Sequence, residues 1–203
     1  MSTTRLLLLG AVRIFQPVHG YLLRRELVSW QVEEWAHVKP GSIYSGLRTL
    51  VSHGLLDEVP GDPVSYRLTP DGEVEFRRLL VTALRDPDPG DASRLLGGLC
   101  FMTVLPRAEV REALRARSLV LEAMMSAASA TVRSLGESRL APASTVELSR
   151  VIGHWLAGER AWVQELCERL DAGYYRFAGD PDGPDRPVQG VWPPAVLDPP
   201  ERA

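Results

Sequence analysis

One helical segment, residues 40–53, constrains the fold of this chain more than any other feature. Pro40 suits the first turn of a helix, and Gly54 stands where a left-handed C-terminal cap is expected. If the segment is a helix, one of its faces is apolar, and the opposite face carries hydroxyls, a phenol and a guanidinium. The segment therefore predicts a helix with one side buried in its own domain and a polar side left for another molecule. The apolar positions that define the buried side are Ile43, Leu47, Leu50 and Val51.

Two helices are predicted before this segment. Residues 4–16 carry apolar side chains at helical spacing, and Gln16-Pro17 ends that helix because proline disfavours helix at the preceding residue. A second helix is expected over residues 20–28, and residues 29–38 show no clear pattern. The apolar run 6–12 is far shorter than the roughly 20 residues that a membrane span needs, so a buried helix is the better interpretation.

Two short strands are predicted after the segment, over residues 55–59 and 64–68, around the turn Pro60-Gly61-Asp62-Pro63. Thr69 as N-cap and Pro70 at the first helical position then open a helix to about Leu84. This order predicts a mainly α fold with a small two-stranded β wing. It is the order of a winged helix-turn-helix domain.

A second, helical region is predicted beyond the Pro- and Asp-rich segment 85–91. Helical patterns follow over about 92–105, 107–136 and 144–172, and the tail from Ala178 holds seven prolines and is expected to be disordered. The expected domains are 1–88 for the winged helix-turn-helix, 92–175 for a helical dimerisation and effector domain, and 178–203 for the tail.

Charge and cysteine usage narrow the class of protein. The net charge is −3, which is unusual for a nucleic-acid binder, but residues 1–56 hold six cations against three carboxylates, or +3. Cys100 and Cys167 cannot build a disulfide framework, so a cytoplasmic location is expected. The residues show no metal-ligand spacing and no catalytic or phosphate-loop motif, so the sequence predicts no enzyme, no metal and no cofactor.

The polar side of residues 40–53 suits duplex DNA. Arg48 has the geometry to donate two hydrogen bonds to guanine O6 and N7, and small hydroxyls let a helix sit deep in the major groove. Lys39 precedes the helix, where backbone amides also attract phosphate. Taken alone, an exposed arginine on a helix is usually solvated. The prediction of a DNA contact therefore depends on the order of helices and wing around this segment. The candidate DNA contacts are Lys39, Ser42, Tyr44, Ser45, Arg48, Thr49 and Arg67.

Five short motifs follow one another within residues 4–85. They are His19-Gly20-Tyr21, Pro40-Gly41-Ser42-Ile43-Tyr44, Leu47-Arg48-x-Leu50, Gly54-Leu55-Leu56 and Tyr66-Arg67-Leu68-Thr69-x-x-Gly72. In this order and spacing they resemble the PadR family of transcriptional regulators. The resemblance extends more weakly to 92–172, where Glu159-x-x-Trp162 is similar to the family's C-terminal dimerisation region.

The resemblance implies a homodimer whose C-terminal helices cross between subunits and whose two winged domains reach successive major grooves of a palindromic operator. It also implies a repressor released by a small aromatic effector. Trp155 and Trp162 are seven residues apart and share a helix face, so they are candidate effector contacts. For each tryptophan alone, packing in a core or an interface is the more common role.

The predicted wing tip departs from a DNA-binding pattern, because it lacks basic residues and Asp62 would repel phosphate. Wing contact would then be limited to Arg67. An alternative function is a winged-helix interaction module that does not bind DNA, and a further alternative is a constitutive dimer without an effector.

Overall fold

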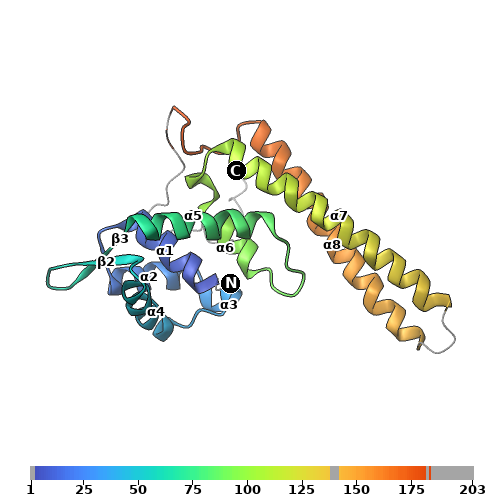
Figure 1. The fold of residues 1–203 in the computed structure, drawn as a ribbon, viewed down its shortest axis with the longest axis horizontal. Coiled ribbons are helices and arrows are strands. Elements are labelled where there is room, and N and C mark those ends of the chain that lie inside the picture. The colour runs from blue at the N-terminus through green and yellow to red at the C-terminus, as the bar shows by residue number, and fades with distance from the viewer. Residues whose placement is uncertain (1–2, 138–141, 182, 184–203) are drawn as a thin grey trace, which may run out of the picture. The chain divides into compact units, whose positions relative to one another are not determined.

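The computed structural model describes residues 3–137, 142–181 and 183. They divide into two compact units. The N-terminal unit holds the described residues up to Leu80 together with Ser93–Met102, and the C-terminal unit holds Val81–Ala92 and the described residues from Thr103 onward. Helices dominate the described chain, which also contains a small antiparallel sheet (Figure 1). The predicted mainly α fold is confirmed.

The helices of the N-terminal unit follow the predicted order. The segment without a clear pattern contains a short helix, α3, in which the Trp35 indole Nε1 donates a hydrogen bond to the Trp30 carbonyl (2.8 Å). His19 caps α2, because its Nδ1 accepts the Leu22 amide at 3.1 Å. The bounds are α1 Thr3–Phe15, α2 Gly20–Ser29, α3 Val32–Ala36, α4 Pro40–Ser52 and α5 Pro70–Arg85.

The wing is a hairpin of β2 (Leu56–Val59) and β3 (Ser65–Leu68), as predicted. A third strand, β1 (Val18–His19), adds to β3, so the sheet has the order β1-β3-β2. The two-stranded expectation was therefore incomplete. A strand of two residues is too short to show the alternation by which sequence patterns reveal strands.

The start of α5 is tied to the end of α4. The Thr69 hydroxyl accepts a hydrogen bond from the Gly72 amide (2.9 Å) and donates one to the Gly54 carbonyl (2.7 Å). Thr69 is therefore the N-cap of α5, as predicted. Gly54 has a positive φ of 69°, as a left-handed cap requires. A Cβ on Gly72 would overlap the carbonyl of Leu55, so this position needs glycine. These contacts fix where the wing leaves α4.

A cluster of aromatic rings organises the core of the N-terminal unit. Phe101, at the end of α6 (Ser93–Phe101), is fully buried and lies 5.7 Å from the Phe76 ring and 6.0 Å from the Trp30 ring. A Cβ on Gly10 would stand 2.5 Å from the Phe101 ring, so α1 and α6 approach closely there. This packing groups α6 with the N-terminal helices, whereas the sequence alone places the domain boundary before residue 92.

The C-terminal unit is built on two long antiparallel helices, α7 (Arg107–Glu137) and α8 (Ala143–Asp171), which follow a short 3₁₀ turn at Met102–Val104 (Figure 1). The core side chains lie in the half of this hairpin near the start of α7. In the other half, over residues 122–137 and 142–155, no described side chain is buried. The buried apolar positions are Val110, Ala113, Leu114 and Leu121 on α7 and Leu156, Val163, Leu166 and Leu170 on α8.

The chain beyond α8 returns to the start of α7. The Arg107 guanidinium donates to the carbonyls of Leu170 (2.6 Å) and Tyr175 (2.8 Å) and to Asp180 Oδ2 (2.8 Å). The Phe177 amide and the Arg107 side chain lower the pKa of Asp180, and Phe177 is fully buried. The predicted tail therefore begins with a held segment at Ala178–Asp180, and its residues 184–203 lie outside the described part of the chain.

Among the described helices, none combines the length and the apolar character that crossing a bilayer needs.

Candidate nucleic-acid interface

Helix α4 presents two different polar surfaces around one buried face. Ile43, Leu47 and Leu50 are almost fully buried, as predicted, and Val51 is half-buried. Gly46 faces α1, where an added Cβ would overlap the Leu8 side chain. Since residues in a helix are roughly 100° apart, the remaining positions divide into an outward surface and a flank toward α1.

The outward surface of α4 carries Tyr44 and Arg48. Arg48 is exposed and has no hydrogen-bond or ion-pair partner among the described residues. Tyr44 is 37% exposed, and its ring rests against Gly20, where a Cβ would stand 2.9 Å from it. A fixed phenol and a free guanidinium therefore stand side by side, one helical turn apart, on the surface that is open to a partner.

The flank of α4 carries the predicted hydroxyls. Each of them donates a hydrogen bond to a carbonyl of its own helix or its cap: Ser42 to Lys39 (2.7 Å), Ser45 to Ser42 (2.9 Å) and Thr49 to Ser45 (2.9 Å). An oxygen whose proton is used in this way still offers lone pairs outward. These hydroxyls are thus arranged to accept hydrogen bonds.

A groove of about 230 Å³ runs between this flank and the first turns of α1. Its walls combine hydroxyls with the guanidinium of Arg5 and apolar side chains below. Thr4 and Arg5 were not among the predicted contacts, because no local pattern shows that the start of α1 meets α4. The lining residues are Thr4, Arg5, Leu8, Ser42, Ser45, Gly46, Thr49 and Leu50.

Arg5 is held in place by its neighbours. One terminal nitrogen donates to Glu75 (3.3 Å), and the other lies 3.3 Å from His53 Nδ1 at the C-terminal cap of α4. Glu75 also accepts Arg78 Nε at 2.7 Å. Hydrogen bonds from Arg78 and then Arg5 lower the pKa of Glu75, which keeps this carboxylate ionised. Two guanidiniums share one carboxylate here, so the cluster keeps a positive excess.

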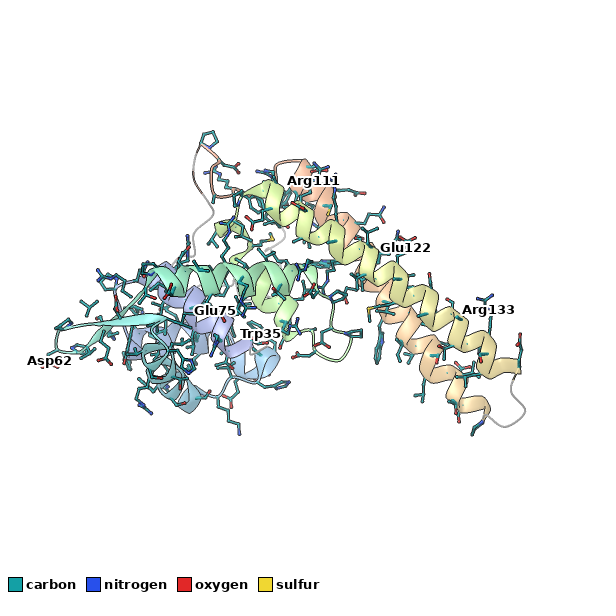
Figure 2. All side chains as sticks on the ribbon, viewed as in Figure 1. Trp35, Asp62, Glu75, Arg111, Glu122 and Arg133 are labelled. Carbon is teal, nitrogen blue, oxygen red and sulfur yellow. The ribbon has the colours of Figure 1, made fainter. Side chains whose placement is uncertain are left out.

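The remaining predicted contacts lie at the edges of the interface. Lys39 is the exposed N-cap of α4. Arg67 is exposed on β3, directly opposite Asp57 of β2, and not on the helix. Asp62 stands at the tip of the hairpin (Figure 2), and Glu58 is also exposed, so two carboxylates stand on the wing surface.

Tyr21 is an exposed residue that the sequence analysis did not select. It is 63% exposed in the first turn of α2 and stacks on His19 with ring centroids 6.3 Å apart. An aromatic residue directly after the capping His19-Gly20 pair was the available signal. The first turn of α2 thus adds a phenol to the same unit that carries Tyr44.

The candidate effector residues lie on one helix and line neither the groove beside α4 nor a second groove between α7 and α8. Trp155 is 61% exposed on α8 and Trp162 is half-buried on the same helix. Trp155 is therefore not a core residue of this chain. A groove of about 380 Å³ lies between α7 and α8, but neither tryptophan lines it. Its lining residues are Met125, Ala128, Ser129, Val132, Arg133, Ser149, Arg150, Gly153 and His154.

Within the described residues, no group of three or more His, Cys, Asp or Glu side chains could hold a metal ion. Cys100 is buried, and this burial raises the pKa of its thiol to about 12. A thiol with such a pKa stays protonated and unreactive. Cys100 therefore behaves as a small apolar core residue.

A scan against protein-family models finds no match, and a search of curated proteins finds none either. Solved structures do match. Those it resembles are PadR regulators. Bacillus subtilis PadR in complex with p-coumaric acid is 17% identical, with coverage of 83% of this chain and 96% of that chain and a TM-score of 0.36.

Two further structures are similar to the same degree. Bacillus subtilis PadR in complex with operator DNA is 18% identical, with coverage of 80% and 97% and a TM-score of 0.35. A PadR-like transcriptional regulator from Bacillus cereus is 18% identical, with coverage of 74% and 99% and a TM-score of 0.35. At TM-scores of this size the similarity carries no argument about function. The proposal below therefore rests on the residues of this chain.

Proposed function

We propose that this protein is a dimeric, sequence-specific DNA-binding transcriptional regulator. The observation that carries the proposal is α4, a helix whose apolar face is buried in its own unit while Arg48 and Tyr44 stand exposed on the other side. A winged helix-turn-helix places such a helix in the major groove, which is about 12 Å wide and admits one helix. Arg48 then reads guanine, and Tyr44 contacts the same groove.

The test of this role is the substitution Arg48→Ala. We expect it to weaken binding to the operator by about 1–3 kcal/mol for each half-site, the scale of one bidentate base contact, and to leave binding to unrelated duplex nearly unchanged. Arg48→Lys should lose most of the same specificity, because a lysine keeps the charge but not the planar fork. Gel shifts with the DNA upstream of the protein's own gene, at two salt concentrations, measure both.

A matched control is Arg115→Ala, which removes an equally exposed arginine from α7 in the C-terminal unit. It should bind the operator as the parent does. Equal operator affinity for Arg48→Ala and the parent would show that Arg48 does not read the sequence.

The acidic wing favours a second candidate, a winged-helix module that binds another protein and not DNA. Asp57, Glu58 and Asp62 are exposed, and carboxylates at these positions repel a phosphate backbone. The two candidates differ in one measurement, since a protein-binding module shows no salt-dependent shift of its upstream duplex. We favour DNA binding because the exposed Arg48 guanidinium of α4 has no carboxylate partner among the described residues. The carboxylates of the wing therefore do not neutralise it.

The dimer of the proposal rests on the half of the α7–α8 hairpin that has no core of its own. Two helices whose side chains are at most half-buried over residues 122–137 and 142–155 gain little apolar burial from packing on each other alone. One stripe of α8 there exposes large apolar side chains at helical spacing, and exposed apolar patches of this kind mark interfaces. The stripe consists of Leu148, Val151, Ile152 and Trp155.

The substitution Trp155→Glu tests the dimer. A carboxylate buried without a partner is strongly unfavourable in an interface, so we expect the chain to sediment as a monomer at micromolar concentration. Operator affinity should fall with it, because one half-site then binds alone. Val74→Glu is the control, since Val74 is 69% exposed on α5 and its substitution should leave the sedimentation unchanged. An unchanged sedimentation coefficient for Trp155→Glu would place the dimer contact elsewhere.

The most specific part of the proposal is that the protein represses transcription and is released from DNA by a small aromatic effector. Trp155 and Trp162 remain its candidate contacts, because Trp155 lies on the stripe proposed as the dimer contact and Trp162 lies seven residues further along the same helix. An effector acts only if it binds the DNA-bound and released states with different affinity. Quenching of tryptophan fluorescence by aromatic acids, with and without operator, measures that difference.

A further inference from the structure

The groove between α1 and α4 lies where DNA backbone is expected if α4 reads bases. An α-helix with its side chains is about 10–12 Å across, nearly the width of the major groove, so its flanks meet the two phosphate backbones. Ser45 and Thr49 belong to the flank that lines the groove, and both are exposed. When Tyr44 and Arg48 face base edges, this flank faces phosphates.

The groove holds the donor that a phosphate needs. Phosphate oxygens only accept hydrogen bonds, and the flank hydroxyls already spend their protons on helix carbonyls. Arg5 has five N–H donors, of which the contacts to Glu75 and His53 use two. Its remaining donors stand on the groove wall, on a side chain that Glu75 already holds in place.

The charges around the groove also favour a bound phosphate. The first turn of α1 has no acidic residue, and Thr4 lies in that turn on the groove wall. The carboxylate of Glu75 is shared between Arg5 and Arg78, and its side chain is only 17% exposed. The groove therefore faces an approaching anion with a net positive cluster.

We propose that this groove seats one backbone phosphate of each DNA half-site and that Arg5 is the residue that contacts it. The proposal rests on the DNA-binding function argued above. It places Ser45 and Thr49 beside the phosphate as groove walls, with Arg5 as the donor, and leaves base reading to Tyr44 and Arg48. It also adds the start of α1, which lies far from α4 in the sequence, to the interface.

The first variant is Arg5→Gln, which removes the charge and leaves a shorter, uncharged polar side chain. Each phosphate contact contributes about 0.9 to the slope of log K against log salt concentration. Since the substitution removes one contact from each of the two half-sites, we expect the slope to fall by about two. The loss of affinity should be equal for operator and unrelated duplex, unlike that of Arg48→Ala. Arg5→Lys should restore the slope, because a lysine supplies the same charge.

The second variant, Thr4→Glu, separates DNA binding from folding. A carboxylate in the first turn of a helix favours the helix dipole, so thermal stability should be kept or raised. The same carboxylate opposes a phosphate in the groove, so binding to both duplexes should weaken at least about tenfold. Thr131→Glu makes the identical change at an exposed position of α7 and should bind DNA as the parent does.

Phosphate ethylation interference on the operator locates the contact. With the parent, ethylation of one phosphate beside each recognition helix should block binding, and with Arg5→Gln this one effect should disappear while the others stay. If the parent binds operator and both variants keep its affinity, slope and interference pattern, the groove holds no phosphate and only this inference fails. If the parent binds no DNA, the proposed function fails and the phosphate site with it.

Discussion

Replacement of Phe101 by alanine is expected to lower the free energy of unfolding of the N-terminal unit by about 3–5 kcal/mol, the usual cost of a buried Phe→Ala change. Phe101 has no exposed surface and makes ring contacts with Trp30 and Phe76. It also fills the space over Gly10, where α1 has no side chain. The substitution leaves a cavity among large rings that cannot close without moving two helices.

Urea denaturation followed by circular dichroism measures this loss as a lower midpoint at an unchanged slope. Leu96→Ala is the matched control, because Leu96 lies on the same helix but is 39% exposed. It should change the free energy of unfolding by less than about 1 kcal/mol. A loss of that small size for Phe101→Ala would mean that α6 does not anchor the N-terminal unit.

Arg117→Met should be similarly destabilising, by about 3–5 kcal/mol, because it removes the buried arginine of a part-buried ion pair and its hydrogen bonds to buried carbonyls. Arg117 is 2% exposed on α7 and donates from Nε to Glu159 of α8 at 2.6 Å. It also donates to the carbonyls of Ala83 (3.1 Å) and Leu84 (3.3 Å), in the last turn of α5. The substitution leaves a carboxylate and these helix-end carbonyls without their donor.

The double substitution Arg117→Met with Glu159→Leu distinguishes a lost pair from lost packing. It removes the isolated carboxylate, so most of the stability should return. Arg111→Met is the exposed control, since the pair of Arg111 with Asp171 is about 40% exposed on both sides and should contribute little. If the double variant is as unstable as the single one, the guanidinium acts through the α5 carbonyls and not through Glu159.

The sequence by itself determined the elements that depend on neighbouring residues. Pro40 and Gly54 bound α4, Thr69 and Pro70 start α5, and the short segments on each side of the turn Pro60–Pro63 form the wing. Capping, proline geometry and periodicity act over a few residues, so they are visible in one dimension. The polar side of α4, with Arg48 and Tyr44, was predictable for the same reason.

Only the tertiary structure decided which distant segments meet. Strand β1 forms because β3 offers it a partner, and Phe101 joins α6 to helices that precede it by some 70 residues or more. Trp155 has the spacing of a core residue and is nevertheless exposed, because a helical repeat is the same whether its apolar face meets its own chain or another. The groove of Thr4 and Arg5 beside α4 likewise depends on a contact between segments about 40 residues apart, which no local pattern encodes.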